Sequence, residues 1–232
     1  MTCSRTRVTR ALIATSVSAV TASLARRRYL RWGATDQEIS MDLPGDQLLP
    51  MANVTATRAI TVLRPSDDVW PWLAQLGQRR GGFYSYDFLE NLVGCDIHSA
   101  DRIVPEWQSI DVGSHVDLAP GVGLTVAVVE AGRAFVLRGA PPMLGKPAPY
   151  DFTWTFVLNE EPNGTSRLIV RERYHYTRRW APLLVEPVQL ISFLMSQKML
   201  RGIRDRAQVA PVPDARRAAT ATYVHCRTGS PG

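Results

Sequence analysis

The sequence predicts an α+β domain in which an antiparallel sheet clasps a long carboxy-terminal helix. Two patterns carry this prediction. Short β-branched segments separated by turn residues extend over residues 115–176, as antiparallel strands do. Apolar residues then recur every three or four positions over residues 183–206, which indicates one long helix. With 232 residues and a hydrophobic fraction of 45%, the chain suffices for one well-buried domain plus appendages.

The first half of the domain is predicted to contain short helices around one strand. The sequence TDQE at residues 35–38 matches a capping box, which starts a helical turn that stops near the Pro-Gly pair after it. Residues 58–63 alternate between apolar and polar side chains, as a strand does. A helix capped by Ser66 follows and extends to about residue 77. Residues 87–93 form a second helical piece.

Turn signals divide the second half into strands. Asn163 and Gly164 are a strong hairpin signal, and the four prolines within residues 139–149 indicate a loop. The predicted strands cover residues 115–119, 124–130, 133–138, 152–158 and 167–176.

The formal net charge of +6 is concentrated at the amino terminus. Residues 1–31 carry seven arginines and no acid, which leaves 20 basic against 21 acidic groups in the rest of the chain. A nucleic-acid-binding protein spreads lysine and arginine over a folded face instead. The composition therefore argues against nucleic acid as a partner.

An uncharged stretch at residues 11–25 lies between these arginines. It is shorter than the roughly 20 apolar residues of a spanning helix. Residues 1–31 are therefore expected to form a membrane-associated segment or a degenerate anchor, attracted to anionic lipid by the arginines. A cleaved signal peptide is less favoured, because three arginines follow the stretch directly. Plain disorder is the third interpretation.

The remaining boundaries follow from composition. The domain is expected to span residues 32–208, and residues 209–232, rich in Ala, Pro, Arg and Thr, are expected to be disordered. The expected location is the cytoplasm, with association to a membrane surface as a further possibility. The sequence does not indicate an oligomeric state.

The three cysteines do not form a recognisable pattern. Cys3, Cys95 and Cys226 lack metal-ligand spacing, and an odd count argues against a disulfide framework. Cys95 lies among apolar residues, as a small buried hydrophobe does. No metal and no cofactor is expected.

Five segments carry a resemblance to a known family. They are WGATD at 32–36, LPGD at 43–46, VWPWLAQLGQRRGGFYSYD at 69–87, CDIHSADRIVPEWQ at 95–108 and SQKMLRGIRDRA at 196–207. Together with the order of elements, they resemble the helix-grip fold of the START-like, or SRPBCC, superfamily and its actinobacterial polyketide cyclase/dehydrase-like subgroup. The resemblance implies a curved antiparallel sheet wrapped around the long terminal helix, which closes a deep apolar cavity. Members include lipid carriers, hormone receptors, cyclases and partner-binding chaperones, and no catalytic motif transfers to this chain.

Residues 81–107 mix aromatic, acidic and apolar side chains, as the wall of a ligand cavity does. His98 and Asp101 would share a face if this segment were helical, so that the carboxylate could orient the imidazole for acid–base work. The favoured alternative is a structured loop in which the aspartates bond backbone N–H groups. Both residues are candidate ligand-binding residues.

Tyr84 and Tyr86 would point to the same side of an extended segment. A phenol joins an apolar ring to one hydrogen-bonding tip, which suits a cavity for a ring-bearing or carbonyl-bearing ligand. Packing in the core is the alternative for each. Asp87 is also a candidate, although its simpler role is the N-cap of the helix that follows.

The strand predicted at residues 167–176 has two contrasting faces. Glu172 lies among apolar and tyrosine side chains, whereas Arg171 and Arg173 lie on the opposite face. If the first face is inward, Glu172 is a carboxylate in the cavity that needs a partner, and Arg138 is a candidate for that partner. If the second face is inward, the two arginines would grip an anionic ligand. Solvation of all of them on the outer side is the third possibility, and Glu172 inward is favoured.

Four apolar side chains complete the candidate ligand-binding set. Trp72 lies on the apolar face of the helix predicted after Ser66. Trp154 and the pair Met195 and Met199 are expected to line opposite sides of one space, since methionine adapts to irregular ligands. Core packing is the alternative for each.

These residues support three functional hypotheses. The first is a module that binds or transports a hydrophobic small molecule, such as a lipid, an isoprenoid or a polyketide-like compound. The alternative is a cyclase or dehydrase-type enzyme in which His98, Tyr84 or Glu172 moves a proton. A partner-binding chaperone is the third. A recognisable nucleophile, metal cluster or phosphate loop is missing from the sequence, which favours binding over catalysis.

Overall fold

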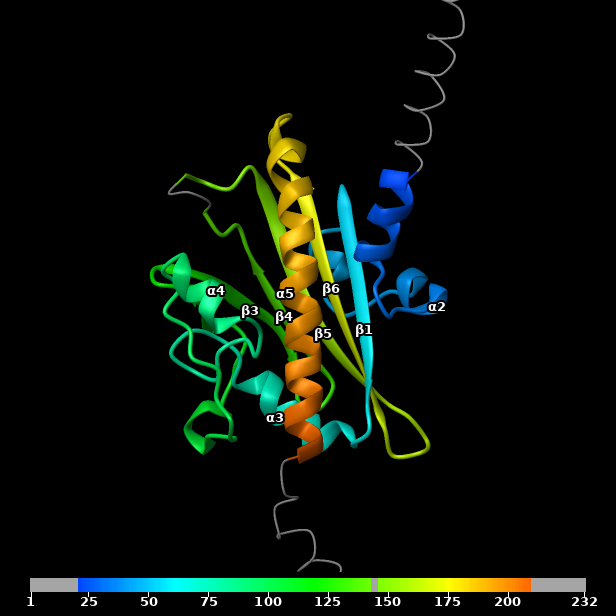
Figure 1. The fold of residues 1–232 in the computed structure, drawn as a ribbon, viewed down its shortest axis with the longest axis vertical. Coiled ribbons are helices and arrows are strands. Elements are labelled where there is room, and N and C mark those ends of the chain that lie inside the picture. The colour runs from blue at the N-terminus through cyan, green and yellow to red at the C-terminus, as the bar shows by residue number, and fades with distance from the viewer. Residues whose placement is uncertain (1–20, 143–145, 210–232) are drawn as a thin grey trace, which may run out of the picture.

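A computed structural model describes residues 21–142 and 146–209, and its six strands form one antiparallel sheet (Figure 1). The strand order is β1-β6-β5-β4-β3-β2. The strands are β1 (Val54–Val62), β2 (His115–Ala119), β3 (Val122–Glu130), β4 (Ala134–Gly139), β5 (Tyr150–Glu160) and β6 (Ser166–Tyr176). The helices are α2 (Asp36–Ser40), η1 (Asp46–Leu48), α3 (Ser66–Ala74), α4 (Asp87–Leu92), η2 (Pro105–Trp107) and α5 (Ala181–Val209).

The longest pairing in the sheet is the hairpin of β5 and β6. The two strands pair without a break from Tyr150 opposite Tyr176 to Glu160 opposite Ser166. Gly164 has a φ of 75° in the connecting turn, a conformation that glycine adopts without a steric penalty. Register shifts interrupt the pairing of β3 with β2 and with β4, and such irregularities bend a sheet.

Helix α5 crosses one face of the sheet, which confirms the predicted helix-grip architecture (Figure 1). It extends the predicted helix by a few residues at both ends. Its buried side chains include Val185, Met199 and Ile203, and they pack with the inward face of β6 and with α3 into the main core. The exposed side of its first half is also apolar, with Leu190 and Leu194 facing solvent.

Several element boundaries differ from the predicted ones. β1 starts at Val54, four residues before the predicted strand, and α3 ends at Ala74. Ser66 is the first residue of α3 and does not cap it; the N-cap is Pro65. The Ser66 hydroxyl instead lies 3.3 Å from the hydroxyl of Ser166 on β6, so it joins the helix to the sheet.

The outer face of the sheet is covered by the segment that contains α2 and η1. The predicted capping box is confirmed, because the Thr35 hydroxyl accepts from the Glu38 N–H and the Glu38 carboxylate accepts from the Thr35 N–H. Small apolar side chains form a second core beneath this segment. They are Leu43, Ala59, Ala134, Val157 and Ile169.

Arginines on the outer face of β6 fasten this covering segment. Arg171 Nη1 donates to Asp46 Oδ2 at 2.5 Å, and its Nη2 donates to the Glu38 carbonyl at 2.7 Å. Arg173 pairs with the same Asp46 at 3.3 Å, and Arg167 pairs with Glu38 at 2.6 Å. These arginines therefore hold chain segments together on the side away from α5, which differs from both alternatives raised for them.

Residues 21–30 are helical and lie along the first half of α5. Arg26 forms a two-point ion pair with Glu186, the Tyr29 ring lies 6.3 Å from the Phe193 ring, and Leu30 belongs to the main core. The chain thus joins the domain before residue 32. The predictions for residues 1–20 and 210–232 lie outside the described residues. Within the described ranges no helix is both long and apolar enough to cross a membrane.

Candidate functional site

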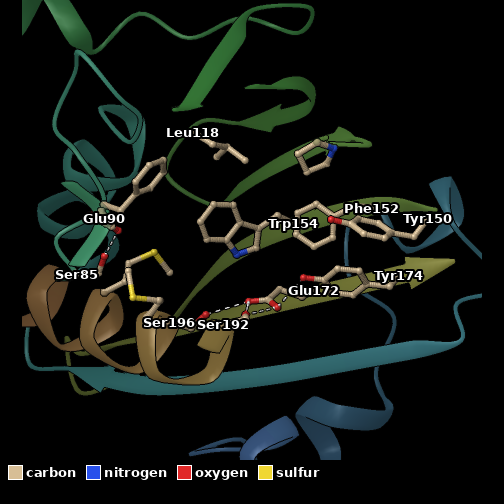
Figure 2. Close-up of a pocket in the computed structure, with 14 residues that line it drawn as sticks. Ser85, Glu90, Leu118, Tyr150, Phe152, Trp154, Glu172, Tyr174, Ser192 and Ser196 are labelled. Atoms are coloured by element: carbon tan, nitrogen blue, oxygen red, sulfur yellow. Dashed lines mark hydrogen bonds between the residues drawn. The ribbon is translucent and has the colours of Figure 1, made fainter. Parts of the chain in front are cut away.

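A cavity of about 270 Å³ lies between the sheet and α5 (Figure 2). Five of the fourteen side chains that line it are aromatic. Tyr150, Phe152 and Trp154 alternate along β5, so all three point to the same face of the sheet. Tyr174 of β6 lies opposite Phe152 in the register, with ring centroids 4.7 Å apart. Phe83, from the segment before α4, closes the wall against Trp154 at 6.0 Å.

Helix α5 supplies the opposite wall. Ser192, Met195, Ser196 and Met199 follow the spacing i, i+3, i+4 and i+7, which places them on one face of the helix. The two methionines contribute flexible apolar surface and the two serines contribute hydroxyls. Trp154 on the sheet side and both methionines on the helix side, predicted to line opposite sides of one space, all line this cavity.

A buried ion pair occupies the floor of the cavity. Arg58 Nη1 donates to Glu172 Oε1 at 2.8 Å, and their side chains are 0% and 3% exposed. The Ser192 hydroxyl lies 2.7 and 2.6 Å from the two carboxylate oxygens, and the Ser196 hydroxyl lies 2.9 Å from Oε1. Tyr174 completes the set at 3.5 Å. Each additional donor offsets the cost of removing the carboxylate from water.

This network shows that the Glu172 face of β6 is inward, as favoured from the sequence. The predicted partner is wrong, however. Arg138 is exposed and lies opposite Thr153, whereas its neighbour Leu137 lies opposite Trp154. Arg138 therefore points to the face of the sheet away from Glu172.

Arg58 was missed because it stands at the start of the predicted strand, where a charged residue is usually solvated. The structure continues β1 four residues further back, which moves Arg58 into the middle of the strand. Its Nε donates to the Tyr29 carbonyl at 3.2 Å. The signal in the sequence that could have identified Arg58 is its charge within a strand whose apolar residues alternate.

Glu90 of α4 is a second carboxyl group at the cavity, and the sequence did not single it out. It is 8% exposed, and Ser85 donates to its Oε1 at 2.5 Å. Burial, with a smaller contribution from the charge of Asp87, raises the pKa of Glu90 above its ordinary value. Its Oε2 has no hydrogen-bond partner among the described residues. This carboxyl group is therefore suited to carry a proton.

Trp72 and Tyr84 lie in the main core beside the cavity, with ring centroids 5.8 Å apart. The Tyr84 hydroxyl accepts from Gln75 Nε2 at 3.0 Å and donates to the Trp72 carbonyl at 3.1 Å. Burial raises the pKa of Tyr84 strongly. Its φ of 56° is left-handed, so the segment is not extended. For this reason Tyr84 and Tyr86 do not share a side, and Tyr86 is exposed.

The residues between α4 and η2 form a loop, and this loop does not bring His98 and Asp101 together. The His98 side chain is 82% exposed and lies 3.4 Å from Asp96. Asp101 is also exposed and accepts from Arg206 of α5 at 3.0 Å. Neither residue lines the cavity. The segment is a loop, as the favoured alternative held, but within the described ranges the contacts of Asp96 and Asp101 are with the side chains of His98 and Arg206 and not with backbone N–H groups.

Asp87 stabilises the same loop. It accepts from the Ser99 N–H and the Ser99 hydroxyl, both at 2.6 Å. It is the first residue of α4, and the N-cap position belongs to Tyr86, so the predicted cap is displaced by one residue. Within the described ranges, no three His, Cys, Asp or Glu side chains are grouped closely enough to hold a metal ion.

Comparisons with known proteins give likenesses in fold. No protein-family model matches the chain, and no curated protein is significantly similar to it. Truncated norcoclaurine synthase from Thalictrum flavum is 15% identical with a TM-score of 0.43, over 68% of this chain and 95% of that one. Zhui aromatase/cyclase from Streptomyces sp. R1128 is 13% identical with a TM-score of 0.40, over 67% and 93%. The protein jhp0584 from Helicobacter pylori is 11% identical with a TM-score of 0.44, over 72% and 96%. At these values the likenesses do not bear on what this chain binds.

Proposed function

We propose that this chain binds a hydrophobic small molecule in the cavity between the sheet and α5. The observation that carries the proposal is the composition of the wall: five aromatic rings and two methionines surround a few polar groups. Apolar surface supplies affinity in such sites and the polar groups set orientation. Lipid-like, isoprenoid and polyketide-like compounds all have this chemistry.

The polar groups that the sequence suggested for proton transfer support binding better than catalysis. Glu172 already accepts hydrogen bonds from Arg58 and two serines. The Tyr84 hydroxyl has two partners outside the cavity, and His98 faces solvent. Glu172 and Tyr84 therefore stabilise the fold around the cavity, His98 lies outside it, and the apolar surface of the cavity remains to bind a ligand.

Binding can be tested with N-phenyl-1-naphthylamine, a neutral probe that fluoresces in apolar surroundings. We expect saturable 1:1 fluorescence enhancement with the full chain. Met195→Trp places a larger side chain into the cavity and should abolish the enhancement. Leu194→Trp, on the exposed side of the same helix, is the matched control and should retain it. No enhancement with the wild-type chain, or equal enhancement with both variants, would contradict the proposal.

We also propose an anchoring role for the amino-terminal arginines. Of residues 1–31, only 21–31 are described, and Arg27, Arg28 and Arg31 are exposed there. This exposure supports attraction to an anionic membrane surface. Sedimentation with phosphatidylserine vesicles should therefore decrease when these three arginines are replaced by glutamine.

A second candidate function is acid–base catalysis of the dehydratase type, favoured by Glu90. A protonated carboxyl group at an apolar cavity can donate its proton to a leaving hydroxyl. In a β-hydroxyketone such as 4-hydroxy-4-phenylbutan-2-one, the C–O bond would break as Glu90 protonates the leaving hydroxyl, and the resulting Glu90 carboxylate would accept the proton from the carbon next to the carbonyl. Water and the conjugated enone are the products, Glu90 is protonated again, and the absorbance of the enone is easily followed. Glu90→Gln should abolish this turnover and preserve probe binding. Absence of turnover in the wild-type chain would leave binding alone as the function.

A further inference from the structure

Two hydrogen-bond donors at the cavity have no partner among residues 21–142 and 146–209. The first is the hydroxyl of Tyr150, whose side chain is 4% exposed. Its ring lies edge-on to Tyr174 at 5.2 Å, and Figure 2 shows the hydroxyl directed toward the middle of the cavity. Within the described ranges no group bonds to it, although Tyr174 is bonded to Glu172. Burial raises the pKa of Tyr150, so the hydroxyl keeps its proton.

The second donor is the indole N–H of Trp154. The nitrogen is buried and finds no acceptor in the described part of the chain. Trp154 lies opposite Glu172 in the register, and in Figure 2 its nitrogen is on the side of the ring toward that residue. The carboxylate already has its donors, so it leaves the indole unpaired. A buried donor without an acceptor is unfavourable, and an acceptor atom on a bound molecule would remove that cost.

The two donors lie in different parts of the cavity. Tyr150 and Trp154 are four residues apart on one strand, so their Cα atoms are roughly 13 Å apart. The Tyr150 hydroxyl is directed toward the middle of the cavity and the Trp154 nitrogen toward Glu172, so each donor calls for an acceptor of its own. The arrangement therefore suits a molecule that carries two acceptor atoms on opposite sides of an apolar body.

The charges at the cavity select a neutral molecule. Its charged lining residues are Glu90 and Glu172, and no Lys, Arg or His lines it among the described residues. Arg58 is nearby, but Glu172 neutralises it. A carboxylate or phosphate ligand would lose its hydration without gaining a free cation, which is a large cost.

The size of the cavity restricts the ligand further. About 270 Å³ is slightly below the range for small-molecule sites, roughly 300–1,000 Å³. Five aromatic side chains line the walls, and their faces and edges pack well against flat rings. A compact molecule of one or two rings fits these limits better than a long acyl chain.

We infer that the cavity takes a neutral, ring-bearing molecule with two carbonyl-type oxygens, one accepting from the Tyr150 hydroxyl and the other from the Trp154 N–H. This inference rests on the proposed binding function and specifies its ligand class. Phe152 lies between Tyr150 and Trp154 on β5 and lines the cavity. Its side chain would pack against the ring of the bound molecule.

Three probes of similar shape test the inference by calorimetric titration of the full chain. They are 2,3-dimethyl-1,4-naphthoquinone, which has two carbonyl oxygens; 2,3-dimethylnaphthalene, which has none; and 3-methyl-2-naphthoate, which is an anion. The quinone should bind best, the hydrocarbon more weakly and the anion least. Each hydrogen bond to a neutral acceptor should contribute about three- to tenfold in affinity.

Tyr150→Phe removes the first donor and keeps the ring. It should weaken quinone binding about three- to tenfold and leave hydrocarbon binding unchanged. Tyr86→Phe, an exposed phenol away from the cavity, should change neither. Equal binding of quinone and hydrocarbon, preference for the anion, or an unchanged Tyr150→Phe variant would overturn the inference. If N-phenyl-1-naphthylamine binds and the quinone does not, the inference fails and the proposed function stands; if neither binds, both fail.

Discussion

Gly202 of α5 lies directly against the backbone of Tyr84. A Cβ atom at position 202 would come within 2.3 Å of the Tyr84 carbonyl oxygen and 2.8 Å of its Cβ. Arg206, one turn further along α5, lies over the Tyr84 ring at 4.9 Å. The helix thus touches the loop before α4 through a glycine, and this contact sets the distance between two walls of the cavity.

Gly202→Ala should therefore destabilise the domain, although alanine is the better helix former. Because backbone rather than a flexible side chain blocks the methyl group, we expect a loss of about 1–3 kcal/mol in the free energy of unfolding. Urea denaturation measures this loss. Lys198→Ala, on the exposed side of the same helix, should change it by less than about 0.5 kcal/mol. A neutral or stabilising Gly202→Ala variant would show that the contact is loose.

We expect single substitutions in the Arg58–Glu172 pair to lower the free energy of unfolding more than a double substitution does. Arg58→Met leaves a buried carboxylate without its cation, and Glu172→Gln leaves a buried guanidinium without its anion. Each should cost about 3–5 kcal/mol in the free energy of unfolding. The double variant Arg58→Met/Glu172→Leu should recover much of that loss. The exposed pair Arg204 and Asp205 gives a control cycle with coupling below about 1 kcal/mol.

Glu90 predicts a pH-dependent contribution to stability. Its folded-state pKa is raised above the ordinary 4.5, so the folded chain holds the proton more tightly than the unfolded chain does. The stabilisation is complete below pH 4.5 and is lost as the pH rises through the folded pKa. Glu90→Gln stays neutral at every pH and can still accept from Ser85.

The unfolding midpoint of Glu90→Gln should therefore rise relative to wild type between pH 4.5 and neutrality, and thermal unfolding at several pH values measures the difference. Glu106→Gln, at an exposed carboxylate, should give a constant difference across the same range. A gap between Glu90→Gln and wild type that stays flat with pH would mean that folding does not raise the pKa of Glu90.

The helices and strands could be predicted from the sequence because each has a periodic pattern of apolar residues or a turn signal within a short segment. The 3.6-residue repeat of α5 and the hairpin signal at Asn163 and Gly164 each depend on neighbouring residues only. The inward position of Glu172 followed from the two-residue period of one strand. Such features need no knowledge of which segments meet.

The partners of the site residues could not be predicted in the same way. Arg58 and Glu172 are 114 positions apart, and their meeting depends on the order of strands in the sheet. Tyr84 and His98 looked suited to a cavity by residue type. A left-handed backbone at Tyr84 and a loop at His98 direct both away from it. Glu90 looked like one more surface acid on a short helix, since its burial comes from tertiary packing.

The hydrogen bonds around the buried Arg58–Glu172 pair also bear on whether α5 or α4 moves when a ligand binds or dissociates. Lifting α5 would pull Ser192 and Ser196 from the carboxylate and break hydrogen bonds that are costly to lose. No ion pair joins the residues of α4 to other described residues. We therefore expect ligands to enter and leave through movement of α4, while α5 keeps its position. Amide hydrogen exchange should then be faster in α4 than around Ser192.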